Sequence, residues 1–164
     1  MLETIVGKRG RGKTSLTAEI LASKKWDRVF IFDYLGEYQP FSEFNRIFVS
    51  NTGFKNFMQT LWKLSREGIE TLVILDEISL YGKYNFQIEH LYRLGRHKQI
   101  QVIATSQRFY SLPVICRSQT DIFHMFQITE PRDVQYLSRL VSPVVLDTIQ
   151  KLGQFEYINI SLSD

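Results

Sequence analysis

Short runs of β-branched and aromatic residues alternate along the chain with longer stretches whose apolar residues recur at helical spacing. The runs predict strands, which we expect at residues 3–6, 28–33, 46–50, 71–77, 101–106, 121–128 and 155–160. The stretches between them predict helices near residues 13–25, 54–66, 85–98, 131–140 and 143–152, and Pro131 and Pro143 suit the first turns of the last two. Strands that alternate with helices indicate an α/β fold, in which a mostly parallel sheet is covered by helices on both faces. Ligands of such sheets bind beyond the carboxyl ends of the strands.

The composition suits one globular domain. The chain has 164 residues, 44% of them hydrophobic, and no repeat, low-complexity tract or linker, so we expect a single domain over residues 1–164. No apolar stretch approaches the ~20 residues that cross a bilayer, and the N-terminus lacks the features of a signal peptide. Cys116 is the only cysteine, so no internal disulfide can form, and no Cys/His cluster has metal-site spacing. These features predict a soluble intracellular protein.

The net charge of +3 is unevenly distributed. Residues 1–28 carry seven basic and three acidic side chains, and residues 83–117 carry six basic and one acidic. The segments 29–82 and 118–164 each have a net charge of −3. Two basic blocks in a nearly balanced chain are consistent with binding to a polyanion, and equally with a solvated charged surface.

The stretch GKRGRGKT, Gly7 to Thr14, follows the first predicted strand and opens the first predicted helix. It matches the phosphate-binding loop: a glycine, four residues, then Gly-Lys-Thr. In that motif the glycines let backbone N–H groups face the phosphates, the lysine reaches the β- and γ-phosphates, and the threonine hydroxyl binds Mg²⁺. The side chains of Lys8, Arg9 and Arg11 lie between the glycines, where loop side chains often point to solvent. The candidate nucleotide-binding residues are Gly7, Lys8, Arg9, Gly10, Arg11, Gly12, Lys13, Thr14 and Ser15.

The apolar stretch TLVILDE ends in Asp76 and Glu77. Asp76 can hold Mg²⁺ through water, and Glu77 can orient or deprotonate an attacking water, whereas the alternative is a charged turn. A small-molecule kinase would not need Glu77, because it must exclude water. A GTPase would need an Asn-Lys-x-Asp stretch to read guanine, and none occurs, although DYLG at residues 33–36 is like a GTPase switch. The sequence therefore favours ATP and Mg²⁺ as ligands and hydrolysis as the reaction.

The apolar run before Thr105, Ser106 and Gln107 predicts a third strand with a polar end. Such an end can simply mark the exit of a strand into solvent. Beside strands that end in the phosphate-binding loop and in Asp76-Glu77, however, the Gln107 amide would lie near the γ-phosphate or the attacking water. There it could sense hydrolysis.

This arrangement resembles the additional-strand ATPases, and further stretches resemble the FtsK/HerA family of DNA-translocating ATPases. FIFDYLGEY at residues 30–38 is similar to the family's Asp-x-x-Gly-Glu-Tyr stretch. GRHKQIQVIATSQR at 95–108 is similar to its Gly-Arg-x-x-Gly-Ile segment and Thr-Gln-Arg sensor, with Gln99 where the family often has glycine. Residues 112–137 resemble the next segment of the family, which has a short helix, a strand and a turn that flanks the nucleotide. The resemblance covers nearly the whole chain.

The resemblance implies a RecA-like P-loop NTPase fold and ring-shaped homo-oligomers, commonly hexamers, that move DNA through a central pore. A motor core without further domains looks most like the genome-packaging ATPases of membrane-containing icosahedral viruses. Its partners would then be DNA, in double-stranded form, and a capsid or viral membrane protein, in the host cytoplasm or the virion. An assembly ATPase of the filamentous-phage type, or a nucleotide-dependent scaffold, is the main alternative. A phosphotransferase acting on a small metabolite would need an acceptor pocket and a lid, which we cannot locate in the sequence.

In this family an arginine from the next subunit completes each site, and Arg96 and Arg117 are the candidates here. Each could instead be an ordinary surface charge. Arg93 is set aside because Glu89, four residues earlier, offers it an intrahelical ion pair.

The aromatic residues of SLYGKYNF, residues 79–86, could contact the bases of single-stranded nucleic acid. We favour the alternative that these residues anchor the helix predicted after them.

Overall fold

The computed structural model describes residues 1–33, 35–38, 47–50 and 53–161. Its strands form one seven-stranded sheet in the order β3-β2-β4-β5-β1-β6-β7. All neighbouring strands are parallel except β6 and β7, which are antiparallel. The strands are β1 (Leu2–Val6), β2 (Arg28–Phe32), β3 (Ile47–Ser50), β4 (Thr71–Leu75), β5 (Ile100–Ser106), β6 (Ile122–Phe126) and β7 (Tyr157–Ile160). The predicted α/β fold with a mostly parallel sheet is confirmed.

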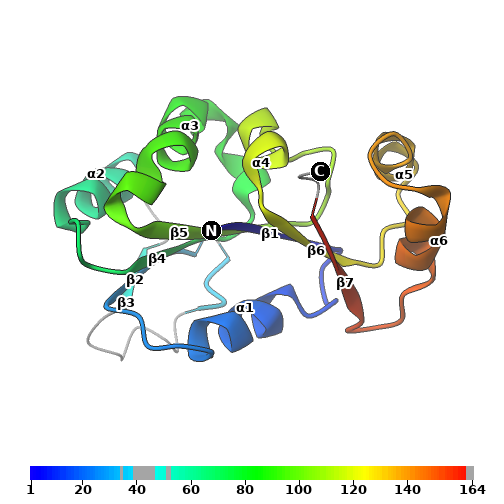
Figure 1. Cartoon of the computed structure of the whole chain (residues 1–164), viewed down its shortest axis with the longest axis horizontal. Coiled ribbons are helices and arrows are strands. Elements are labelled where there is room, and N and C mark those ends of the chain that lie inside the picture. Colours follow the sequence, from blue (N-terminus) through cyan, green and yellow to red (C-terminus); the bar gives the residue numbers. More distant parts are fainter. Residues whose placement is uncertain (34, 39–46, 51–52, 162–164) are drawn as a thin grey trace.

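Helices cover both faces of this sheet (Figure 1). Helix α1 (Lys13–Ala22) lies on one face, and α2 (Phe54–Leu64), α3 (Asn85–Leu94) and α4 (Val114–Gln119) lie on the other. Helices α5 (Pro131–Leu137) and α6 (Pro143–Lys151) stand beside the β6–β7 end, and the 3-10 helices η2 (Ile78–Tyr84) and η3 (Gly95–Lys98) flank α3. None of the helices in the described ranges is long and apolar enough to span a bilayer.

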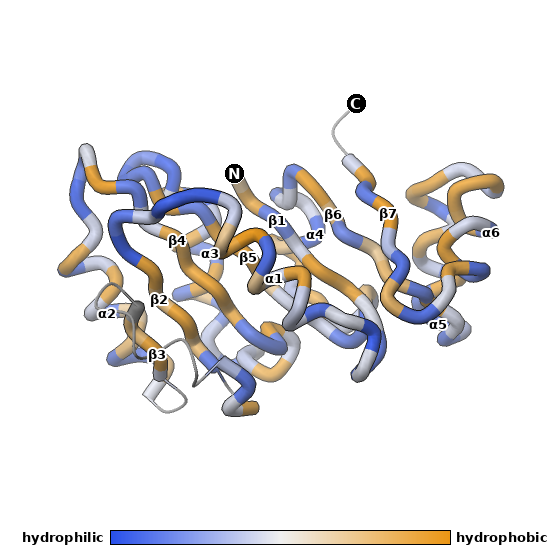
Figure 2. Tube along the Cα trace, turned by 90° about the horizontal axis from the view of Figure 1, so that it is seen from below, coloured by the Kyte–Doolittle hydropathy of each residue, from blue (hydrophilic) through white to orange (hydrophobic). Residues whose placement is uncertain are grey.

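Alternating side chains of the strands build two separate hydrophobic cores. Ile31 and Ile74 belong to the core under α1, whereas Phe30 and Val73 belong to the core under α2 and α3. All four side chains are buried, and burial of a side chain of this size contributes about 1.5–3 kcal/mol. The central strands are hydrophobic along most of their length and end in polar segments (Figure 2), which is typical of parallel strands covered on both faces.

The order of the strands places β5 between β1 and β4. Val6 of β1 is paired with Ser106, and Leu75 of β4 is paired with Ala104. The end of β5 is therefore flanked on one side by the loop after β1 and on the other by the acidic residues after β4. This insertion is the additional strand that the sequence predicts.

Several predicted elements differ from the observed ones at their ends. Helix α3 ends at Leu94, and residues 95–98 form η3. Gln99 adopts a left-handed conformation (φ 53°) that ends η3 and turns the chain into β5. Strand β7 begins at Tyr157, because Phe155 is also left-handed (φ 66°). The predicted strand 46–50 and the stretch 33–36 each include one residue, Arg46 and Tyr34, that lies outside the described part of the chain.

Candidate active site

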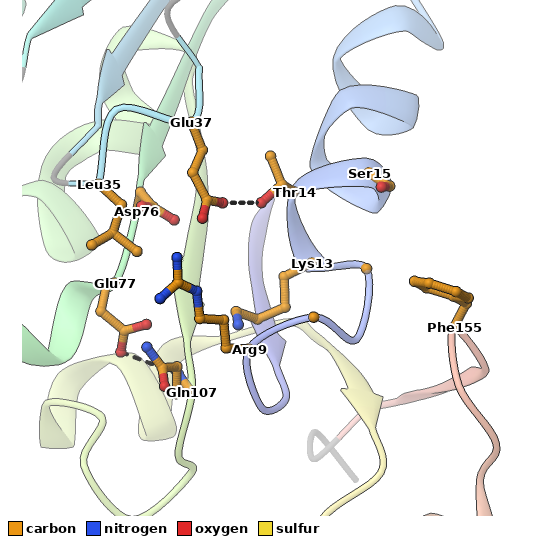
Figure 3. A pocket seen from close by; sticks show the side chains of 12 residues that line it. Arg9, Lys13, Thr14, Ser15, Leu35, Glu37, Asp76, Glu77, Gln107 and Phe155 are labelled. Atoms are coloured by element: carbon orange, nitrogen blue, oxygen red, sulfur yellow. Dashed lines mark hydrogen bonds between the residues drawn. The ribbon is translucent and has the colours of Figure 1, made fainter.

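A cavity of about 300 Å³ opens at the carboxyl ends of β1, β4 and β5 (Figure 3). Most of the residues that the sequence singles out lie in its wall, although they come from three separate stretches of the chain. The lining consists of Arg9, Gly10, Gly12, Lys13, Thr14, Ser15, Leu35, Glu37, Asp76, Glu77, Gln107 and Phe155. Parallel strands that end at one edge of the sheet bring these stretches together.

The loop between β1 and α1 is seated against aromatic side chains. A Cβ atom at Gly7 would lie 2.6 Å from Cβ of Phe126, which is a clash, so only glycine fits there. Gly10 and Gly12 have φ angles of 77° and 104°, a region that L side chains avoid. The Gly7 N–H donates to the carbonyl oxygen of Ser106 at 3.1 Å. The glycines are therefore required by the shape of the loop.

Lys13 lies back along this loop. Its Nζ donates to the carbonyl oxygen of Gly7 at 2.8 Å. Partial burial lowers the pKa of the Lys13 ammonium group, and the carboxylates of Glu77 and Asp76 oppose this effect. The ammonium group thus faces these carboxylates, and it lies within the cradle that would hold phosphates.

The acidic pair after β4 is almost completely buried. The Thr105 hydroxyl donates to Oδ1 of Asp76 at 2.8 Å and accepts from the Glu77 N–H at 2.9 Å. Burial raises the pKa of Asp76 to about 6, the Thr105 hydrogen bond opposes this rise, and nearby carboxylates, Glu37 first, add to it. The site thus keeps a buried carboxyl group that is costly to ionise on its own.

The arrangement of oxygen atoms fits a Mg²⁺ ion. Oδ2 of Asp76 is buried and has no hydrogen-bond partner within the described residues, and leaving such an atom unpaired costs about 1–3 kcal/mol. The Thr14 hydroxyl donates to Oε2 of Glu37 at 2.6 Å, which leaves its lone pairs available to a cation. The parts of the chain that are described hold no group of three or more His, Cys, Asp or Glu residues that could bind a metal. Mg²⁺ would therefore be shared between Thr14, Asp76 and phosphate oxygens, which is its usual mode of binding.

Glu77 is held in a defined orientation. Its backbone is left-handed (φ 49°), and its Oε1 accepts hydrogen bonds from Ser79 Oγ at 2.7 Å and from the Gln107 N–H at 3.1 Å. The exposed side chain of Gln107 lies beside Glu77 at the same end of the cavity (Figure 3). The structure thus places the strand end of β5 in direct contact with Glu77.

The basic side chains of the phosphate-binding loop point in different directions. Arg9 points into the cavity, on the side of the acidic residues (Figure 3). Lys8 donates to the hydroxyl of Thr129 at 2.7 Å, and Arg11 donates to Oε1 of Gln127. Lys8 and Arg11 therefore tie the loop to the segment between β6 and α5, and of the three side chains only that of Arg9 lines the cavity.

The two candidate trans-acting arginines differ in their surroundings. Arg96 is exposed on η3, which precedes β5 and so lies at the opposite end of that strand from Gln107. Arg117 is half-buried, donates from Nη1 to the carbonyl oxygen of Tyr110 at 2.7 Å, and stands 4.9 Å from the ring centre of Tyr136. Arg117 thus links α4 to the Tyr110 segment and to α5, whereas Arg96 has no such ties within the described ranges.

The ion pair expected between Glu89 and Arg93 is not formed within 4.0 Å, and Arg93 is exposed on α3. In the stretch 79–86, Tyr81 is buried and donates to the carbonyl oxygen of Asp76, and Tyr84 packs 4.9 Å from the ring of Phe54. These two aromatic residues therefore anchor the segment before α3, as the sequence favours, while Phe86 is exposed.

Three residues of the cavity, Leu35, Glu37 and Phe155, were not among the site residues predicted from the sequence. Glu37 lies within the stretch 30–38 that resembles the FtsK/HerA motif, which is the signal that could have identified it. The Glu37 N–H donates to Oδ1 of the buried Asp33 at 2.9 Å, and this hydrogen bond fixes the backbone of Glu37 relative to the end of β2. Phe155 lies after the last helix and had no local signal, because its place beside Gly12 depends on how β7 pairs with β6.

The fold of this chain is similar to that of several proteins of known structure. No family model and no curated protein matches the sequence. The genome-packaging NTPase B204 of Sulfolobus turreted icosahedral virus 2, in complex with AMP, superimposes with a TM-score of 0.81 at 22% identity, over 98% of this chain and 92% of that one. B204, the DNA-packaging ATPase from Sulfolobus turreted icosahedral virus, gives 0.78 at 21% identity, over 98% and 92%.

More distant similarity extends to ATPases 2 and 3 of EssC from Geobacillus thermodenitrificans. The TM-score is 0.75 at 12% identity, over 97% of this chain and 37% of that one. The chain therefore shares the fold of these ATPases, in agreement with the α/β fold that its resemblance to the FtsK/HerA family implies.

Proposed function

We propose that this protein is an ATPase motor that couples hydrolysis of ATP to movement of DNA, in the packaging of a viral genome. The observation that carries the proposal is the convergence of Lys13, Thr14, Asp76, Glu77 and Gln107 on one cavity. The fold likeness to B204, which has been solved in complex with ATP-γS and with AMPPCP, supports it.

The chemistry depends on the hydrogen bonds of Glu77. Its Oε1 is occupied by Ser79 and the Gln107 N–H, whereas Oε2 accepts no hydrogen bond from the described residues. Oε2 is therefore the atom that takes the proton from the attacking water, while Lys13 and the loop amides hold the phosphates. Bound Mg²⁺ would neutralise charge on the phosphate oxygens. The Gln107 side chain would meet the γ-phosphate, and its N–H would transmit any shift of β5 to Glu77.

DNA is the proposed partner because of the fold likeness and the basic residues that remain exposed. Many basic side chains make internal contacts: Arg28 donates to the carbonyl oxygen of Leu64, and Lys24 pairs with Glu70 at 3.1 Å. Arg93 and Arg96, by contrast, are both exposed on the α3–η3 segment. A ring of subunits would present this segment in several copies, which suits a polyanion.

The direct test is the rate of ATP hydrolysis with and without double-stranded DNA. We expect DNA to stimulate turnover, and we expect DNA binding to weaken steeply with salt, with a log–log slope near −0.9 for each contacted phosphate. A rate that is indifferent to DNA would favour a scaffold ATPase, and transfer of phosphate to a metabolite would favour a phosphotransferase. Either result would overturn the motor assignment.

Glu77→Gln should retain nucleotide affinity, because Lys13 and the loop amides are unchanged. It should lower turnover by about 10²–10⁴-fold, because the amide cannot accept the proton of the attacking water. Single-turnover hydrolysis and equilibrium binding of ATP measure the two effects separately. Glu67→Gln, at an exposed position outside the cavity, is the matched control. Survival of activity within a few-fold in Glu77→Gln would remove Glu77 from the role of base.

Asp76→Asn should make the protein more stable at pH 8 while abolishing Mg²⁺-dependent turnover. Burial raises the pKa of Asp76 from 3.8 to about 6 in the folded state, so ionisation at pH 8 costs folding about 3 kcal/mol. This cost is absent when the carboxyl group is protonated, so the advantage of the variant should shrink as the pH falls through 6 toward 4. Urea denaturation of parent and variant at pH 8 and pH 4.5 measures the difference. An equal difference at both pH values would contradict the buried-carboxylate explanation.

The contacts of the two candidate arginines predict different effects of substitution on stability. Arg117→Ala should lower the free energy of unfolding by about 1–3 kcal/mol, because it removes the hydrogen bond to Tyr110 and the contact with Tyr136. Arg96→Ala should change stability by less than about 0.5 kcal/mol and still lose activity. Denaturant unfolding and ATPase assays on both variants make the comparison.

Mixing experiments then show whether Arg96 acts on a neighbouring subunit. If Arg96 acts in trans, chains carrying Arg96→Ala and chains carrying Glu77→Gln should each be inactive alone, but their mixture pairs an intact glutamate with an intact arginine at some interfaces. Activity should therefore return on mixing. The same cross is made with Arg117→Ala, and Arg139→Ala, at an exposed arginine outside both the cavity and the α3–η3 segment, serves as the control. If the chains co-assemble and neither arginine cross recovers activity, no shared site involves these residues.

A further inference from the structure

The cavity has two ends, and the proposed chemistry uses only one of them. Glu77 and Gln107 lie at one end, the phosphate-binding loop lies in the middle, and Phe155 lies at the other end (Figure 3). A nucleoside triphosphate is an elongated molecule whose γ-phosphate must reach Glu77. Its base must then lie beyond the loop, on the side of Phe155.

Phe155 is unusual for a hydrophobic residue in two respects. Its side chain is 63% exposed although it lines a cavity, and its backbone is left-handed (φ 66°). A left-handed conformation is strained for a bulky residue and is often found at functional sites. Glu77, Gln99 and Phe155 are the three non-glycine residues with positive φ among those described, and two of them line this cavity.

The ring of Phe155 is held beside the phosphate-binding loop. A Cβ atom at Gly12 would lie 3.1 Å from Cδ1 of Phe155 and 3.5 Å from the ring of Phe126. Two residues later, Tyr157 pairs with Phe126 across the antiparallel β6–β7 ladder, and their rings are 5.4 Å apart. The position of Phe155 is thus set by the sheet itself, while one side of its ring remains open to the cavity.

We infer that Phe155 is the platform on which the nucleobase of the bound nucleotide stacks. The inference rests on the proposed function, because it assumes that Lys13 and the loop amides hold the phosphates. An exposed aromatic ring at the base end offers a flat surface to a heterocycle, and stacking of this kind tolerates different bases. Phe155 is therefore a binding residue for the nucleoside part of the ligand, separate from the residues that act on the phosphates.

The test compares ligands with and without a base. ADP and inorganic pyrophosphate, each with Mg²⁺, are titrated calorimetrically into the parent protein, Phe155→Ala and Phe155→Gly. We expect both variants to bind ADP roughly ten-fold more weakly than the parent, as loss of base stacking implies, and to bind pyrophosphate within about two-fold of the parent. GDP should lose affinity together with ADP, because stacking does not read the edges of the base.

Three controls separate stacking from structural damage. Phe155→Gly suits the left-handed backbone, so its thermal denaturation midpoint should equal or exceed that of the parent even though its ADP affinity falls. Phe86→Ala, at a phenylalanine that is 78% exposed and outside the cavity, should bind ADP as the parent does. Phe155→Trp should retain ADP affinity near that of the parent, and the fluorescence of the added tryptophan should change with ADP but not with pyrophosphate.

The outcomes distinguish the two proposals. If Phe155→Ala weakens ADP and pyrophosphate equally, the ring only shapes the loop, and if it weakens neither, Phe155 is not a base platform. Both results overturn this inference and leave the ATPase proposal intact. If the parent protein binds neither ligand, or if Lys13→Ala binds both as well as the parent does, the proposed function itself fails.

Discussion

Thr105 couples the two halves of the candidate active site. Its hydroxyl donates to Asp76 at 2.8 Å and accepts from the Glu77 N–H at 2.9 Å. The carbonyl oxygen of the next residue, Ser106, accepts from Gly7 at 3.1 Å, where the phosphate-binding loop begins. The end of β5 therefore holds the acidic pair on one side and the phosphate-binding loop on the other. Because Asp76 and Glu77 are buried, each would lose polar partners if β5 were displaced, at a cost of about 1–3 kcal/mol for each unpaired group. The polar end of β5 thus supplies the hydrogen-bond partners of the buried Asp76 and Glu77, in addition to its proposed part in hydrolysis.

The central part of the site was predictable because it depends on local pattern and on one rule of topology. Apolar runs followed by the glycine-rich loop Gly7 to Thr14, by Asp-Glu and by Thr-Ser-Gln predict strands, and parallel strands bring their ends to one edge. The contacts of Arg117 could not be predicted in this way, because Tyr110 and Tyr136 approach it from other elements. The Glu89–Arg93 pair illustrates the reverse case, since helical spacing permits the contact but the exposed side chains do not form it, and an exposed ion pair of this kind contributes little free energy. The place of Phe155 depends on the antiparallel return of β7, which the alternation of strands and helices does not indicate.

Gln99 shows how a departure from a family pattern is accommodated. The stretch 95–108 resembles a motif that often has glycine at this position, and in the structure the position is left-handed, with φ 53°. Glycine adopts this conformation without strain, whereas glutamine does not. The glutamine side chain makes a compensating contact, because its Oε1 accepts from the Gly68 N–H at 2.6 Å. That hydrogen bond joins the start of β5 to the segment before β4, so the two strands that carry Gln107 and the acidic pair are also tied at their opposite ends.

The electrostatics of the cavity link stability to function. Glu37, Asp76 and Glu77 approach one another around Lys13, and burial raises the pKa of Asp76 to about 6 while lowering that of the Lys13 ammonium. A fold selected for stability alone would not keep a buried carboxyl group whose Oδ2 has no partner among the described residues. A divalent cation bound to Oδ2 through water, and phosphates bound to Lys13, would supply the opposite charges that both groups lack. Binding of a nucleotide with its cation should therefore stabilise the folded protein at Asp76 and Lys13, which are also groups of the proposed reaction. The cost of the buried, unpaired carboxylate would then be relieved only when the nucleotide is in place.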